Sequence, residues 1–265
     1  MRRVALVLAA AAAFDESLFD PDACARGFEH ACAYGPPPAK AAVELPLLHE
    51  PRVKLWWPAL DDVVAIAQDA ANPYDAPTTL WPAGAVLAHA LASDCASWQG
   101  KVILELGCGV GAAALALARC GASVVATDIS EAALALAAEN TNGTVATDVS
   151  GATPALAAEN TNGTVVMRLL DWDDDGSLAA AVAAHGPFFA VVGAALKFEA
   201  WPAGRLDAVL GVLDPTVVVL AHAWAEDDVE DLLDDPWRRA ASFAGAAVGL
   251  EEFSAVTWVR RAPDL

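Results

Sequence analysis

Three glycines, Gly107, Gly109 and Gly111, alternate with other residues at the junction of two contrasting segments. An apolar run from Val102 to Leu106 precedes them, and an alanine-rich run from Ala112 to Cys120 follows. The first run predicts a buried strand and the second a helix. Glycine at every second position lets the backbone approach a ligand where a Cβ atom would block it. The pattern therefore predicts a strand–loop–helix unit with a ligand site at the loop.

The spacing of the glycines narrows the class of ligand. A nicotinamide dinucleotide site has the pattern G-x-G-x-x-G, which serves a pyrophosphate. Here the pattern is E-x-G-x-G-x-G, beginning at Glu105 and passing through Cys108, whose backbone lies in the loop. A second predicted strand, residues 123–127, is followed by Asp128, about 20 residues downstream of the glycine pattern. In nucleotide-binding folds an acidic side chain at this position accepts hydrogen bonds from the ribose hydroxyls.

This combination resembles the first motif of the S-adenosylmethionine-dependent methyltransferases with a seven-stranded sheet. The resemblance implies S-adenosylmethionine as the cofactor, with Glu105 suited to its ammonium group and Asp128 to its ribose. It also implies an α/β fold: a Rossmann-like, doubly wound, mostly parallel sheet of seven strands that ends in an antiparallel hairpin. Alternating strand and helix patterns along the chain indicate the same parallel sheet.

Two segments that contain tryptophan indicate one subgroup of these methyltransferases. Trp81, in Leu80-Trp81-Pro82-Ala83-Gly84, precedes the first strand, and Trp172 follows Asp171 after a later strand. With Ala194, which ends the next strand, they resemble the protein-lysine methyltransferases of the methyltransferase-like group. In that group these segments flank the cofactor, and an aromatic neighbour suits a flat adenine. The resemblance extends over about residues 78 to 224.

The segment that lines the lysine channel in that group departs from its pattern D-x-x-Y. Ala195 stands at the acidic position and Phe198 at the tyrosine, with Lys197 and Glu199 beside them. A carboxylate orients the amine, whereas alanine orients nothing, and Glu199 is a candidate substitute. No catalytic residue can therefore be assigned. The function expected is methyl transfer to a protein lysine. A small-molecule methyltransferase and an inactive cofactor-binding or interaction protein remain as alternatives.

A near copy of one segment distinguishes this chain from an ordinary member of the fold. Residues 126–145 are followed by a similar stretch at 146–165, which gives a tandem repeat of 20 residues. Two copies are too few for a solenoid, so one copy is expected to be an insertion at the sheet edge or in a loop. The second copy carries Pro154, which shortens any helix there. We therefore assign the ribose contact to Asp128 rather than Asp148.

The domain organisation follows from the same pattern. Residues 1–77 read as an irregular N-terminal extension with a proline-rich linker, and residues 78–265 as the methyltransferase domain. Within the extension, Val63 to Ala71 reads as a short helix. Toward the C-terminus, Asp228 to Ala241 reads as a helix, and residues 245–252 and 254–260 as an antiparallel pair.

Composition limits partners and compartment. The net charge of −20 argues against nucleic-acid binding and would steer a basic protein substrate toward the surface. No apolar stretch is long enough to span a membrane, and no metal-ligand spacing appears. Five cysteines without paired spacing indicate reduced thiols, with Cys95 and Cys120 as core residues, and a cytoplasmic location. Residues 1–13 leave organelle import or secretion as the alternative. The oligomeric state cannot be read from the sequence.

Overall fold

A computed structural model describes most of the chain from residue 50 onward. The described residues are 50–57, 60–72, 75–142, 144–146, 163–196, 204–223, 233, 237–244 and 253–260. Two sheets are formed within them, one of two strands and one of eight.

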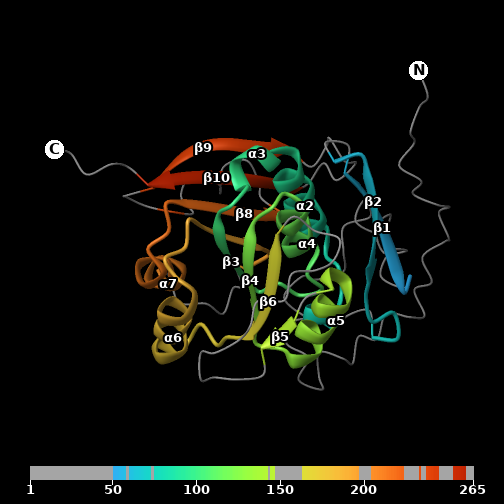
Figure 1. Ribbon diagram of the computed structural model, residues 1–265, viewed down its shortest axis with the longest axis horizontal. Helices are drawn as coiled ribbons and strands as arrows, with labels where there is room; N and C mark the ends of the chain where they lie inside the picture. Colours follow the sequence, from blue (N-terminus) through green and yellow to red (C-terminus); the bar gives the residue numbers. More distant parts are fainter. Residues whose placement is uncertain are drawn as a thin grey trace.

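The large sheet has the strand order β5-β6-β4-β3-β7-β8-β10-β9 (Figure 1). Neighbouring strands from β5 to β8 are parallel, and β10 is antiparallel to both β8 and β9. This confirms the predicted mostly parallel, Rossmann-like sheet with a C-terminal antiparallel pair. The bounds are β3 (Val102–Leu106), β4 (Ser123–Asp128), β5 (Thr144–Ala146), β6 (Thr164–Leu169), β7 (Ala190–Ala194), β8 (Val217–Ala223), β9 (Trp237–Ala244) and β10 (Phe253–Arg260).

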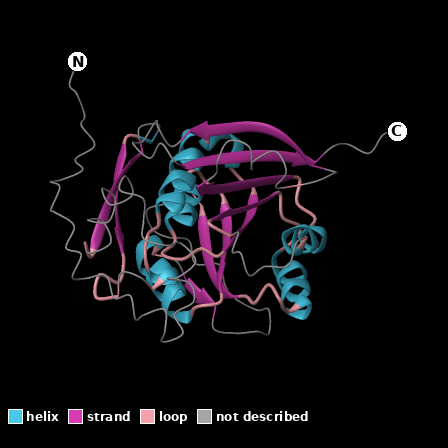
Figure 2. Cartoon of the chain, turned by 180° about the vertical axis from the view of Figure 1, so that it is seen from behind, coloured by secondary structure: helices cyan, strands magenta, loops and turns pink. Residues whose placement is uncertain are grey.

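Helices cover both faces of this sheet (Figures 1 and 2). Successive residues of a strand point to opposite faces, so Ile103 and Leu104 enter two different apolar clusters. One cluster lies under α2 (Pro82–Ser93), α3 (Cys95–Trp98), α4 (Ala112–Arg119) and α5 (Glu131–Thr141). The other lies under α6 (Asp175–His185) and α7 (Arg205–Leu213). No helix among the described residues is long and apolar enough to cross a membrane.

The repeated segment explains why the sheet has eight strands rather than seven. Thr144 and Val145 at the end of the first copy begin β5, and the equivalent Thr164 and Val165 at the end of the second copy begin β6. The two strands are parallel neighbours, with Thr144 opposite Val166. The first copy also supplies the end of β4 and all of α5, while residues 147–162, including Asp148, lie outside the described residues. The repeat therefore extends the edge of the sheet by one strand.

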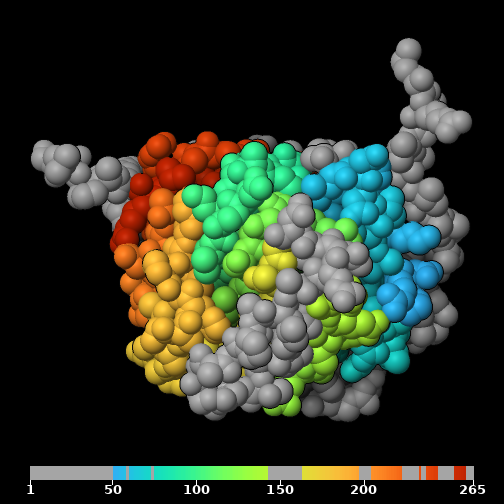
Figure 3. All heavy atoms as spheres, viewed as in Figure 1, coloured from blue at the N-terminus to red at the C-terminus, as the bar shows by residue number. Residues whose placement is uncertain are grey.

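Part of the N-terminal extension forms a regular hairpin. Strand β1 (Arg52–Trp57) pairs antiparallel with β2 (Asp62–Ala67), so the helix predicted to begin at Val63 is wrong. An apolar run of this length cannot be assigned to helix or strand by periodicity alone. Trp57 and Ile66 are fully buried in the cluster that holds α2, α4 and α5. The space-filling view shows the hairpin, in blue, against the yellow-green atoms of α5 (Figure 3).

The C-terminal pair differs in its first strand from the prediction. Strand β9 begins at Trp237, within the segment predicted to be a helix, and pairs with β10. The buried Trp237 joins the second apolar cluster, so pairing with β10 and burial of this side chain outweigh the local helix pattern. The predicted strand at 245–252 lies outside the described residues.

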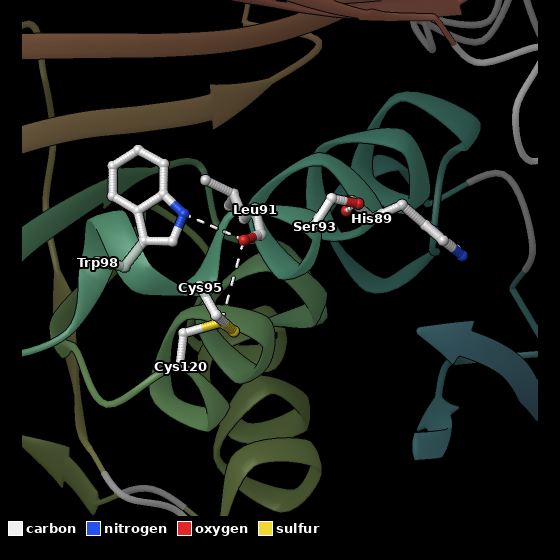
Figure 4. Close-up of a disulfide and its surroundings, with 6 residues drawn as sticks. All are labelled: His89, Leu91, Ser93, Cys95, Trp98 and Cys120. Atoms are coloured by element: carbon white, nitrogen blue, oxygen red, sulfur yellow. Dashed lines mark hydrogen bonds between the residues drawn. A yellow bond between two sulfur atoms is a disulfide. The ribbon is translucent and has the colours of Figure 1, made fainter. Parts of the chain in front are cut away.

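A disulfide joins Cys95 in α3 to Cys120, which follows α4 (Figure 4). The expectation of reduced thiols is therefore wrong for this pair, although Cys120 is buried in the apolar core and Cys95 packs against it, as expected. Their Cα atoms are 4.7 Å apart, within the range that a disulfide spans. Beside it, the Trp98 indole nitrogen donates to the carbonyl oxygen of Leu91 at 3.0 Å. The bridge ties α3 to the end of α4, and this hydrogen bond ties α3 to α2. Cys108 is a free, buried thiol.

Candidate functional site

The glycine loop joins the end of β3 to the start of α4, as predicted. Gly107, Gly109 and Gly111 all have positive φ angles, of 60°, 51° and 79°. Residues with side chains rarely adopt such angles. Within the loop, the Gly111 N–H donates to the Cys108 carbonyl oxygen at 2.8 Å, and the Cys108 N–H donates to that of Thr127 at 2.8 Å. The loop is therefore a tight turn tied to β4.

Each glycine also has a different neighbour. A Cβ atom on Gly107 would lie 3.2 Å from Leu196 and 3.3 Å from the Trp172 ring. On Gly109 it would lie 3.4 Å from the carbonyl oxygen of Pro77, and on Gly111 only 2.8 Å from the Cβ of Ala137 in α5. The absence of a side chain at Gly111 therefore allows the loop to pack against α5. At Gly107 it allows the side chains of Trp172 and Leu196 to lie close to the loop.

Glu105, the second-to-last residue of β3, is buried inside the fold. Its Oε2 atom has no hydrogen-bond partner among the described residues. Burial raises the pKa of Glu105 to about 8, against a lowering by a hydrogen bond from the backbone of Ala114, and the charge of Asp128 raises it further. Glu105 is therefore a buried carboxyl group for which the described residues supply no positively charged partner.

Asp128 ends β4 and lies against the same loop. Its Oδ2 accepts a hydrogen bond from the Gly109 N–H and its Oδ1 from the Ser130 N–H, both at 2.9 Å. Burial raises the pKa of Asp128 above its usual value, and these backbone donors lower it. Burial, with the charges of Glu105 and Asp128, also raises the pKa of the Cys108 thiol well above its usual range. The Cys108 side chain is therefore a neutral thiol, while its backbone N–H and carbonyl oxygen form hydrogen bonds within the loop.

The other predicted cofactor residues lie at different distances from the loop. The Trp172 ring lies directly beside Gly107, on the side where a Cβ atom would project. The register places Leu106 beside Gly193, so Ala194 follows at the level of Gly107 on the neighbouring strand. Trp81 is connected to the loop only through an intervening turn. Its indole nitrogen donates to the Ala76 carbonyl oxygen at 2.7 Å, in the 3₁₀ turn (Ala76–Thr78) that approaches Gly109 through Pro77.

Two exposed apolar residues were not singled out from the sequence. Ile129 follows Asp128 and its residue is 67% exposed, and Leu169, opposite Asp128 in the sheet register, is 48% exposed. An exposed apolar pair beside a buried carboxylate suits the face of a flat, polar-edged ligand. The sequence signal would have been an apolar residue directly after an acidic strand end.

Ala195 has an unusual backbone conformation for its residue type. Its φ is 54°, and its N–H donates to the Ala221 carbonyl oxygen at 2.8 Å. Aspartate and asparagine are several-fold enriched in this left-handed region, where alanine is strained. The backbone at position 195 is therefore one that the acidic residue of the expected pattern would tolerate. Lys197, Phe198 and Glu199 lie outside the described residues.

Comparison with known families places this site in context. Residues 103–211 match a family model described as a methyltransferase domain. That range contains the glycine loop, Asp128, Trp172 and Ala194. A mouse protein, the electron transfer flavoprotein beta subunit lysine methyltransferase, is 39% identical over 88 residues. The match covers 33% of this chain and 31% of the mouse protein, so the chain spans about a third of that relative.

Solved structures share the fold at low identity. The magnesium protoporphyrin IX methyltransferase of Synechocystis PCC 6803 with bound SAH aligns with a TM-score of 0.50 and 16% identity, over 68% of this chain and 84% of that one. A protein from Streptococcus mutans assigned to the SAM-dependent methyltransferases aligns with a TM-score of 0.52 and 12% identity, over 79% of this chain and 56% of that one. Both confirm the Rossmann-like fold.

Proposed function

Because residues 103–211 match a methyltransferase domain model and the sheet is Rossmann-like, we propose that this protein is an S-adenosylmethionine-dependent methyltransferase. The observation that carries the proposal is the buried Oε2 atom of Glu105, which has no hydrogen-bond partner among the described residues. A buried carboxyl oxygen without a partner is costly unless a ligand supplies one. The ammonium group of the methyl donor would do so.

Residues beside the loop fit the remaining parts of that cofactor. Asp128 already accepts two backbone hydrogen bonds, and a carboxylate has further lone pairs for ribose hydroxyls. Trp172 and Ile129 would bound the adenine. When bound, S-adenosylmethionine supplies a methyl group on a positively charged sulfur. The chain's own task is then to hold the cofactor, exclude water and orient the acceptor.

We further propose that the acceptor is a lysine side chain of a protein. Two observations support this: the partial match to a lysine methyltransferase, and the Trp81 and Trp172 segments of the resemblance. The net charge of −20 would favour a basic protein. The backbone at Ala195 accepts an acidic residue, but alanine supplies no carboxylate, so amine orientation would depend on another group, with Glu199 as the candidate.

Calorimetry at pH 7, in buffers that differ in ionisation enthalpy, tests cofactor binding. At pH 7 a Glu105 with a pKa of about 8 is protonated, and pairing with an ammonium favours its ionised form. Binding should therefore release a proton, and the observed enthalpy should vary with the ionisation enthalpy of the buffer. In Glu105→Gln this variation should disappear. Gly109→Val, at a φ of 51°, should abolish binding in a folded protein. Unchanged affinity in that variant would overturn the site.

A cell extract incubated with the protein and a labelled methyl donor tests the acceptor. Label in proteins that is recovered as methyl-lysine supports the lysine proposal. Label in small molecules instead would make the protein a small-molecule methyltransferase. Binding without any transfer would identify a cofactor-binding protein that does not catalyse.

A further inference from the structure

One side-chain amide connects the glycine loop to the N-terminal hairpin. Asn140, near the C-terminal end of α5, accepts a hydrogen bond at Oδ1 from the Ala67 N–H at 2.7 Å. Its Nδ2 donates to the Ala67 carbonyl oxygen at 2.9 Å and to the Val110 carbonyl oxygen at 2.8 Å. The amide therefore pairs with both backbone groups of Ala67, as a neighbouring strand would, and with the loop at the same time.

Val110 lies between Gly109 and Gly111, so its carbonyl oxygen belongs to the loop itself. The loop touches α5 at a second point, because Gly111 packs against Ala137, three residues before Asn140. Residues three apart lie on one face of a helix. One face of α5 thus holds the loop by a close packing contact and by a hydrogen bond.

The hairpin has other attachments that do not involve the loop. Arg52 in β1 forms an ion pair with Glu139 at 2.8 Å, with both side chains more than half exposed. Asp62, in β2, pairs with Arg119 at 3.3 Å. Glu139 and Asn140 are adjacent in α5, but only Asn140 also binds the loop. A change at Glu139 therefore affects only attachment of the hairpin, whereas a change at Asn140 also affects the position of the loop.

We propose that Asn140 is a positioning residue of the cofactor site, which holds the Val110 peptide in place and couples the glycine loop to docking of the β1–β2 hairpin. This inference rests on the proposed function for its ligand. The hairpin then contributes to cofactor binding without touching the cofactor. Asparagine suits this role because its amide is both acceptor and donor. Alanine at 140 would leave the Val110 carbonyl and both Ala67 groups without these partners.

Three variants test the proposal: Asn140→Ala, Asn140→Asp and, as the matched control, Glu139→Ala. The aspartate keeps an acceptor for the Ala67 N–H but loses both donated bonds. Hydrogen exchange of the ligand-free protein is measured at Gly109 and Gly111, whose N–H groups are bonded within the site, and at Ala67. Binding of S-adenosylhomocysteine, and KM and kcat for the methyl donor, are measured on the same proteins.

We expect Asn140→Ala to speed exchange at both glycines and at Ala67 by about 10-fold or more, and to weaken S-adenosylhomocysteine binding by a similar factor. The KM for the donor should rise while kcat changes little, because the amide does not touch the reacting atoms. Asn140→Asp should match the alanine variant at the glycines but protect Ala67 better. Glu139→Ala should leave the loop and the affinity unchanged.

Two results would overturn the proposal. One is unchanged exchange and affinity in a folded Asn140→Ala protein, and the other is an equal effect in Glu139→Ala. If the alanine variant does not fold, Asn140→Asp carries the same test, since it retains the hairpin acceptor. Failure of the wild-type protein to bind S-adenosylhomocysteine would instead refute the proposed function, and with it the ligand part of this inference.

Discussion

Replacing Glu105 by glutamine should change how the stability of the ligand-free protein depends on pH. The wild-type carboxyl is buried, and burial raises its pKa from 4.5 to about 8. Glutamine has nearly the same shape and cannot ionise. The variant therefore keeps the packing of β3 but removes one titration from the folded and the unfolded chain.

The sign and size follow from proton binding in the two states. Between pH 4.5 and about 8 the unfolded carboxyl has lost its proton while the folded one keeps it. The folded state then binds more protons, so the free energy of unfolding falls as the pH rises. Each pH unit corresponds to about 1.4 kcal/mol. With rounding at both ends of the window, Glu105 should destabilise the protein by about 3 kcal/mol between pH 5.5 and 8.

Urea denaturation of both proteins at pH 5.5, 6.5, 7.25 and 8 measures this effect. Asp128 and the other titrating groups are present in both chains, so their contributions largely cancel in the difference. The unfolding free energy of Glu105→Gln minus that of the wild type should increase by about 3 kcal/mol across the series. A constant difference would refute the reasoning, since it would mean that Glu105 ionises in the folded state as it does in the unfolded chain.

Three further predictions follow from the site and its supports. Asp128→Ala should weaken S-adenosylhomocysteine binding by about 10-fold or more, through loss of charge-assisted hydrogen bonds worth about 1.5–3 kcal/mol each. Asp148→Ala should change the affinity little, and equal losses in titration calorimetry would contradict assignment of the site to the first copy. Ala195→Asp should raise methyl transfer to protein amines by about 10-fold, because a carboxylate would orient the amine; an unchanged rate, with cofactor still bound, would argue against the lysine channel. Cys95→Ser should lower the unfolding free energy by about 3 kcal/mol, since the bridge to Cys120 closes a loop with a sequence separation of 25; equal midpoints for the two proteins in urea would exclude that contribution.

The features predicted correctly are those that the local sequence determines. An apolar run of five residues, three alternating glycines and an alanine-rich helix define the β3–α4 unit, because strand pattern, positive φ and helix propensity all act within a few residues. Asp128 could be placed because a parallel neighbour ends at the same edge of the sheet. The alternation of strands and helices was likewise sufficient for the parallel sheet.

The incorrect predictions concern segments whose local pattern fits two structures. Val63 to Ala67 is short and apolar, and only pairing with β1 makes it a strand. Trp237 to Ala241 carries a helix pattern, yet β10 supplies strand partners and a place to bury Trp237. In both cases hydrogen bonds to distant residues outweigh a weak local preference.

Contacts between residues far apart in sequence were decided by the tertiary structure alone. Nothing in their spacing pairs Cys95 with Cys120, which the packing of α2 against α4 brings together. Gly111 reads as a ligand-loop glycine, but the approach of Ala137 gives it a packing role. In the sequence, Asn140 is one polar residue of a repeated segment. Only the fold brings the backbone groups of Ala67 and Val110 within hydrogen-bonding distance of its side-chain amide. The sequence by itself thus determined the strand–loop–helix unit and the type of sheet, because those depend on short-range geometry. The supports of the loop required the tertiary structure, because they depend on which distant backbone groups the packed helices bring within hydrogen-bonding distance.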